Sequence, residues 1–331
     1  PWVVGIAIFW AVSATLFAPR FEGKSLGQGD IAQYAGMSAD IRNHREATGE
    51  DPQWTGGMFS GMPAYLIDVE YPTQSVKQGA SGVAKLFGDP MNMILFAMIF
   101  MMVAVVLMGV NPWIGIIAGL AYGLSTYFFL IIDAGHITKM WALVYAPAML
   151  GSIHYTLRQN MWVGGALTAL FAALEAGANH PQITYYFVLA AAALFISELV
   201  FAIKNRVCKN FAYRTVVLVG AAILALGANF APLYYTMQHT SDTTRGGSAL
   251  AVESERKGLD IDYATAWSYG IDESWNMLIP DFMGGDSGAT FSKDGEVAES
   301  LKRLGADRRT AEQIAQQLPT YWGEQPYTAG P

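Results

Sequence analysis

The residues with the clearest chemical potential are an aspartate, two histidines and a lysine in three separate polar segments. Asp30 lies in the run Gly-Asp-Ile-Ala-Gln, His136 and Lys139 share the run Gly-His-Ile-Thr-Lys, and His180 lies in Asn-His-Pro-Gln. A carboxylate can accept a proton from an attacking hydroxyl group. Lysine and histidine can donate hydrogen bonds to a phosphate. These residue types therefore predict a shared site that binds an anionic phosphate, if the fold brings the three segments together.

Three further polar residues are predicted to bind substrate. Gln33 follows Asp30 closely, Gln182 follows His180, and Asp281 lies in the run Ile-Pro-Asp-Phe-Met near the C-terminal end. Asp281 could contact substrate hydroxyl groups, and capping of a turn is the alternative role for this residue.

The segment from Asp30 to about Ala47 is predicted to be a helix. Asp30 suits the N-cap, where a side-chain oxygen accepts a backbone N–H, and this is the alternative to a catalytic role. On one continuous helix, Asp30, Gln33, Asp40 and His44 would lie near one stripe. Asp40 and His44 are therefore candidate ligands of a divalent metal, with a solvated helix face as the alternative. The set is too loose to name a metal, so the cofactor stays unknown.

Long apolar blocks separate the polar segments, and they predict an all-α polytopic membrane protein. Hydrophobic residues make up 53% of the chain and charged residues 14%, whereas a soluble domain carries about 25% charged residues. Each block is near the length that crosses about 30 Å of hydrocarbon as a helix. About seven transmembrane helices are expected, at residues 1–18, 92–110, 112–132, 141–157, 162–177, 182–203 and 215–237.

The order of these blocks predicts two regions. Residues 1–237 form a transmembrane domain in which a large exoplasmic loop, 19–90, follows the first span. Residues 238–331 form an exoplasmic segment. Within it, 296–318 has apolar residues at helical spacing, with Gly305 as an interruption. This pattern predicts a packed helical pair outside the membrane, and the alternative is an amphipathic segment on the membrane surface. The abrupt apolar start and the C-terminal end both suggest a fragment, with further spans after residue 331.

Positive charge predicts the orientation of the spans. Lys and Arg concentrate between the sixth and seventh blocks, at Lys204, Arg206, Lys209 and Arg214, and Arg158 follows the fourth block. Short loops rich in Lys and Arg face the cytoplasm. The single cysteine, Cys208, is therefore expected in a cytoplasmic loop, and the segments that hold Asp30, His136, Lys139 and His180 are expected outside. The net charge of −7 argues against binding to nucleic acid.

Taken together, five segments resemble the bacterial YfhO family of membrane proteins. They are Gly29-Asp30-Ile31-Ala32-Gln33-Tyr34, Gly57-Met58-Phe59-Ser60-Gly61-Met62-Pro63, Gly135-His136-Ile137-Thr138-Lys139, Asn179-His180-Pro181-Gln182 and Tyr321-Trp322-Gly323. The family is placed among the GT-C-type glycosyltransferases, which are polytopic enzymes with polyprenyl-phosphate-linked sugar donors. Asp30 matches the acidic residue that these enzymes carry in their first exoplasmic loop.

This resemblance implies a glycosyltransferase in the bacterial cytoplasmic (inner) membrane. Its partners would be the polyprenyl-phosphate-linked donor, membrane lipid and a cell-envelope glycan or polymer as acceptor, with the site on the exoplasmic face. Asp30 would be the catalytic base, while His136, Lys139 and His180 would stabilise the departing phosphate. The competing hypotheses are a non-enzymatic membrane scaffold and a transporter of envelope-assembly intermediates. A transporter would carry ionisable residues near the bilayer midplane.

Overall fold

The computed structural model describes residues 1–69, 71–239, 271, 274–275, 278–279, 282 and 290–318. The chain divides into two compact units, Pro1–Gln238 and His239–Pro331. Asp281 and the run Tyr321-Trp322-Gly323 lie outside the described residues. The first unit contains all the other candidate site residues.

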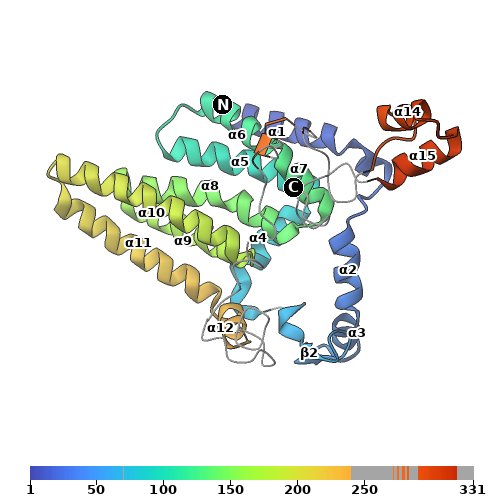
Figure 1. Ribbon diagram of the computed structural model, residues 1–331. Helices are drawn as coiled ribbons and strands as arrows, with labels where there is room; N and C mark the ends of the chain where they lie inside the picture. Colours follow the sequence, from blue (N-terminus) through green and yellow to red (C-terminus); the bar gives the residue numbers. More distant parts are fainter. Residues whose placement is uncertain are drawn as a thin grey trace, which may run out of the picture. The chain divides into compact units, whose positions relative to one another are not determined.

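The first unit is built mainly from helices (Figure 1). One short antiparallel pair, β1 (Trp54–Thr55) and β2 (Met62–Pro63), lies between α3 and α4. The α-helices in chain order are α1 (Trp2–Leu16), α2 (Gly29–Met37), α3 (Ala39–Thr48), α4 (Ser75–Lys85), α5 (Met91–Leu107), α6 (Pro112–Gly123), α7 (Thr126–Ala134), α8 (Ile137–Arg158), α9 (Met161–Gly177), α10 (Pro181–Lys204), α11 (Cys208–Ala228) and α12 (Phe230–His239).

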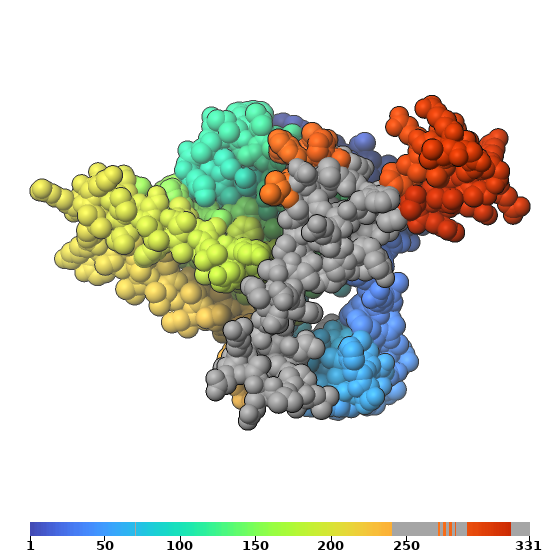
Figure 2. Space-filling view, in the orientation of Figure 1, coloured from blue at the N-terminus to red at the C-terminus, as the bar shows by residue number. Residues whose placement is uncertain are grey.

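Among the described residues, two helices are long and apolar enough to cross a membrane. They are α10 with 24 residues and α11 with 21, and only 11% of the apolar window of each is buried within the protein. Their side chains form part of the outer surface in Figure 2, in yellow and gold. Such large exposed apolar faces are typical of a membrane or protein interface. The pair α6 and α7 counts as a third span if its 45° bend is a break within one crossing, while α1, α5 and α9 are apolar but shorter.

The centre of the first unit is a closely packed set of helices that includes α5, α8 and α9. Small residues allow these helices to approach one another. A Cβ on Gly151 of α8 would lie 2.6 Å from Cα of Ala104 in α5, and one on Gly164 of α9 would lie 2.5 Å from Oγ1 of Thr156 in α8. Contacts between small residues are the usual way in which helices associate in membranes. Met98, Met102 and Met140 fill the space around them and are almost fully buried.

Three predicted boundaries need correction. The segment from Asp30 to Ala47 is not one helix, because the helix breaks at Ser38 between α2 and α3. Oγ of Ser38 donates to the carbonyl oxygen of Tyr34 at 2.7 Å and accepts from Nη1 of Arg42 at 2.7 Å. Bonding of a serine to the preceding turn competes with the regular helix pattern. The expected stripe of Asp30, Gln33, Asp40 and His44 is therefore wrong.

The other two corrections concern predicted spans. The block 112–132 is divided between α6 and α7, with the 45° bend between them. The block 215–237 is also divided, because α11 runs from Cys208 to Ala228 and α12 follows. At this break Asn229 donates from Nδ2 to the carbonyl oxygen of Ala173 at 2.8 Å, and its Oδ1 accepts from Gln74 at 3.2 Å. At its other end, α11 begins at Cys208, so this cysteine is the first residue of a helix and not part of a loop as predicted.

The described part of the second unit includes a pair of helices, α14 (Glu296–Arg303) and α15 (Arg308–Gln317). Gly305, at a φ of 98°, lies in the turn between them. Asp307 caps α15 by accepting the backbone N–H of Thr310 at 3.1 Å. Ala298, Ala311 and Ala315 are buried, so the two helices pack through their small residues. This agrees with the helical pair predicted for 296–318.

Candidate functional site

The first and second polar segments meet in the structure. Oδ2 of Asp30, in the first turn of α2, lies 3.2 Å from Nε2 of His136, which is the N-cap of α8. About half of each side chain remains exposed, 51% for Asp30 and 42% for His136. The pair therefore brings a carboxylate and an imidazole within contact distance, and both side chains remain accessible.

The turn between α7 and α8 is shaped to receive the start of α2. Gly135 has a φ of 92°, which side-chain-bearing residues rarely adopt. A Cβ at Gly135 would lie 3.0 Å from Cβ of Asp30 and 3.3 Å from Cβ of Gln28. Nε2 of Gln28 also donates to the carbonyl oxygen of Ile132, at the end of α7. Gly135 and Gln28 thus position Asp30 beside His136.

We expect Gly135→Ala to destabilise the first unit by about 1–2 kcal/mol, because an L-residue is strained in the left-handed region. The new methyl group also presses on Asp30, so the Asp30–His136 contact should lengthen. Chemical denaturation of the purified protein measures the first effect. Gly36→Ala is the matched control, because Gly36 lies inside α2 with open space around its Cα. A loss of stability for Gly36→Ala equal to that for Gly135→Ala would contradict this account.

The charge of Lys139 acts on both His136 and His180. Partial burial lowers the pKa of His136, the charge of Lys139 lowers it further, and Asp30 opposes this in part. Partial burial likewise lowers the pKa of His180, with further lowering by Lys139 and His136. Both imidazoles therefore favour the neutral form more than a free histidine does. The site combines these two imidazoles with the side chains of Asp30 and Lys139.

The third polar segment, Asn179-His180-Pro181-Gln182, lies at the start of α10. Nδ1 of His180 accepts the backbone N–H of Ile183 at 3.3 Å, so His180 is the N-cap of α10. Nε2 of the neutral ring then carries its proton. Gln182 is exposed and donates to the hydroxyl group of Tyr186 at 3.3 Å. Nζ of Lys139 lies 5.7 Å from the ring centre of Tyr127, within range of a cation–π interaction.

Asp30 is not the N-cap of its helix. The N-cap is Gln28, and Asp30 is the second residue of α2. The capping alternative from the sequence is therefore wrong. A carboxylate in the first turn of a helix is still favoured by the partial positive charge at that end. Gln33 is exposed further along α2.

The candidate metal ligands lie in a different setting. Asp40 and His44 belong to α3 and not to α2. A Cβ at Gly57 would lie 3.0 Å from Oδ2 of Asp40, so that carboxylate lies against the glycine-rich loop. Within the described residues, no group of three or more His, Cys, Asp or Glu side chains could hold a metal ion.

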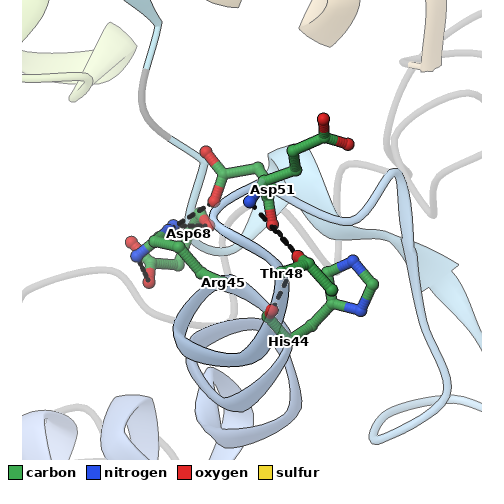
Figure 3. Close-up of polar contacts among 6 residues, drawn as sticks. His44, Arg45, Thr48, Asp51 and Asp68 are labelled. Carbon is green, nitrogen blue, oxygen red and sulfur yellow. Dashed lines mark hydrogen bonds and ion pairs between the residues drawn. The ribbon is translucent and has the colours of Figure 1, made fainter.

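The polar contacts around His44 hold α3 in place and do not form a ligand site. Its carbonyl oxygen accepts from Oγ1 of Thr48 at 2.8 Å. The next residue, Arg45, contacts Asp51 at 2.5 Å and Asp68 at 3.4 Å. Figure 3 shows the His44 ring pointing away from these carboxylates. This network holds α3 against the following loop.

A cavity of about 310 Å³ opens beside the Asp30–His136 pair. Its lining includes Gln28, Ile31 and Ile137, which flank the pair in sequence, but not Asp30 or His136 themselves. The remaining lining comes from α4, the segment around Asp89 and the starts of α5 and α8. The cavity is therefore lined by residues next to the pair in sequence and not by the pair itself.

Comparison with known protein families, with curated proteins and with solved structures finds no match. The function must therefore be argued from the geometry of the site.

One polar cluster was missed by sequence reasoning. Glu198 of α10 is buried, and its carboxylate contacts Nδ1 of His154 at 3.1 Å and also Nε of Arg158. Arg158 lies over the ring of Phe201, 3.2 Å from its centre. The signal for this cluster was the single glutamate inside the apolar run 182–203, opposite the basic end of α8.

Proposed function

We propose that this chain is part of a membrane glycosyltransferase of the GT-C type that resembles the YfhO family. It transfers a sugar from a polyprenyl-phosphate-linked donor to a cell-envelope acceptor. The contact between Asp30 and His136 is the observation that carries the proposal. It joins two polar segments that lie far apart in the sequence and places a carboxylate beside a neutral imidazole at the ends of apolar helices.

The proposed reaction uses these groups in defined roles. The acceptor hydroxyl oxygen forms a bond to the anomeric carbon, and its proton passes to the carboxylate of Asp30. The bond between that carbon and the phosphate oxygen breaks, and the phosphate leaves with the electron pair. Lys139 and the N–H groups of His136 and His180 stabilise the charge on the departing polyprenyl phosphate. Gln33, Gln182 and Asp281 are proposed substrate contacts.

In this proposal about seven helices cross the bacterial inner membrane, and α10 and α11 are the best-supported spans. The ends of the helices alternate between two faces. Asp30, His136 and His180 mark one face, which is exoplasmic. Arg158 and Arg214 mark the other, where Nη1 of Arg214 donates to the carbonyl oxygen of Thr156 at 2.6 Å.

We expect Cys208 to be labelled from the cytoplasm only. Its side chain is accessible at the start of α11, next to the basic connection between α10 and α11. A membrane-impermeant maleimide should label it in permeabilised cells and not in intact cells. Cys208→Ser carrying Glu46→Cys is the matched control, because Glu46 is exposed on α3 and should be labelled in intact cells. Labelling of Cys208 in intact cells would reverse the orientation and remove the site from the exoplasmic face.

The direct test of the proposed function is a transfer assay on the full-length protein in proteoliposomes. A radiolabelled hexose on polyprenyl phosphate serves as donor, and the assay follows the loss of label from the lipid to an envelope glycan fraction. Transfer that depends on the protein would support the proposal. A well-folded protein that transfers no sugar from a panel of such donors would instead favour the scaffold hypothesis.

A further inference from the structure

We infer that the cavity beside Asp30 and His136 is a binding site for a single uncharged sugar ring. We identify the ligand as a sugar because of the proposed function. We infer that a binding site exists from the cavity itself and from the buried side chain of Asn92 in its wall. At about 310 Å³, the cavity is at the small end of ligand pockets, which run from about 300 to 1,000 Å³. It therefore suits one ring and not an extended chain.

The strongest indication of a ligand is Asn92, which lines the cavity and is 0% exposed. Its Nδ2 donates to Oδ1 of Asp89 at 2.7 Å and to the carbonyl oxygen of Ala84 at 3.2 Å. Its Oδ1 has no hydrogen-bond partner in the described part of the chain. Buried polar atoms are nearly always paired, and leaving one unpaired is unfavourable. This oxygen has almost no accessible surface, so a hydroxyl group in the cavity would have to enter beside Asn92 to supply the missing donor.

The rest of the lining has the mixed character that a sugar requires. Trp141 lines the cavity and stacks on Tyr145, with ring centres 5.4 Å apart. An indole binds the apolar C–H face of a sugar ring, while its N–H can serve a hydroxyl group. Gln28 and Ser81 line the same cavity and can donate or accept hydrogen bonds.

Charge in the cavity wall favours an uncharged ligand. Lys85 and Asp89 both line it, so the formal charges of the two side chains cancel. A free phosphate would meet the carboxylate of Asp89 as well as the lysine, and an alkyl chain would leave Asn92, Gln28 and Ser81 without partners. A neutral ring with several hydroxyl groups satisfies all of these side chains.

The position of the cavity fits a role in transfer. Ile31 and Ile137 line it, and each is the direct neighbour of a member of the Asp30–His136 pair. The cavity would thus supply orientation, while Asp30 supplies the base.

The test is a binding measurement that needs no catalysis. The full-length protein in lipid nanodiscs, free of glycoside detergent, is titrated with methyl hexopyranosides and followed by saturation-transfer NMR. Ser81→Phe should fill the cavity and weaken binding by at least about tenfold, which is 1.4 kcal/mol. Val83→Phe is the matched control, because Val83 lies on the same helix, is 54% exposed and does not line the cavity. Trp141→Leu is a second variant that shortens the aromatic wall without blocking it, and it should also weaken binding.

The outcomes are distinct. Binding of a methyl hexopyranoside that is lost in Ser81→Phe and kept in Val83→Phe supports the site. The site is excluded if no hexopyranoside binds, or if all the folded variants bind the sugar equally well. It is also excluded if inorganic phosphate or a prenyl alcohol displaces the sugar. Asp30→Asn should still bind the glycoside. If the sugar binds but no transfer occurs, the cavity stands and the proposed function fails. If sugar transfer occurs and Ser81→Phe leaves both transfer and binding intact, the proposed function stands and the sugar site in the cavity is wrong.

Discussion

Asp30→Asn is expected to reduce sugar transfer by about 10²- to 10⁴-fold, which is the usual contribution of a general base. Asparagine keeps the size of the side chain and can still contact His136, whose Nε2 lies 3.2 Å from the carboxylate of Asp30. It cannot take the proton of the acceptor hydroxyl group. The protein should therefore fold normally and bind donor, while the rate of loss of radiolabelled sugar from the lipid falls.

Two comparisons make this experiment decisive. Glu46→Gln removes an exposed carboxylate from the neighbouring helix α3 and should leave transfer unchanged. Lys139→Ala should weaken handling of the donor phosphate, since it removes a cation from the site. Transfer by Asp30→Asn at the wild-type rate would show that Asp30 is not the base.

The second large effect is expected for Glu198→Ala, which should lower the free energy of unfolding by about 3 kcal/mol. Removing one partner of a buried ion pair costs roughly 3–5 kcal/mol, because the other charge is left without compensation. The lower end applies here, since the side chain of Arg158 is 30% exposed and can regain some hydration. Glu198 also contacts His154, so its loss frees α10 from two positions on α8.

Denaturation of the purified protein in mild detergent measures this loss. Glu22→Ala is the matched control, because its pair with Lys24 is about two-thirds exposed, and exposed pairs contribute no more than about 1 kcal/mol. Glu198→Gln keeps the shape of the side chain and part of its polar contacts, so its loss in the free energy of unfolding should lie between those of Glu198→Ala and Glu22→Ala. If Glu198→Ala and Glu22→Ala unfolded alike, the cluster would have no role in holding α8 and α10 together.

The sequence was most informative where the pattern was local and strongly apolar. Runs of apolar residues predicted α1, α5, α8, α9 and α10 closely, whereas two other predicted blocks are each divided between two helices. The segments around Asp30 and His136 were also predicted to converge, and these two residues do meet. Their place on the exoplasmic face of a membrane stays a prediction.

Other features depended on side-chain packing. The break at Ser38 arises from hydrogen bonds to Tyr34 and Arg42, and a serine in a predicted helix is a weak signal for such a break. The contact between Glu198 and Arg158 requires the rotational setting of two helices, which a single sequence does not give. The cavity around Asn92 has the same origin, because four separate segments contribute its wall.

The helix that carries Asp30 has a further consequence. No residue of α2 is buried, so little apolar packing holds it, and its described attachments to the turn after α7 are concentrated at its first residues. Such weakly packed elements open at low free-energy cost. Activity would then scale with the fraction of molecules in which α2 is docked, and a substrate that touches both α2 and α8 would raise that fraction by its own binding. Assembly of the catalytic pair and recognition of the substrate would in this way be one thermodynamic event.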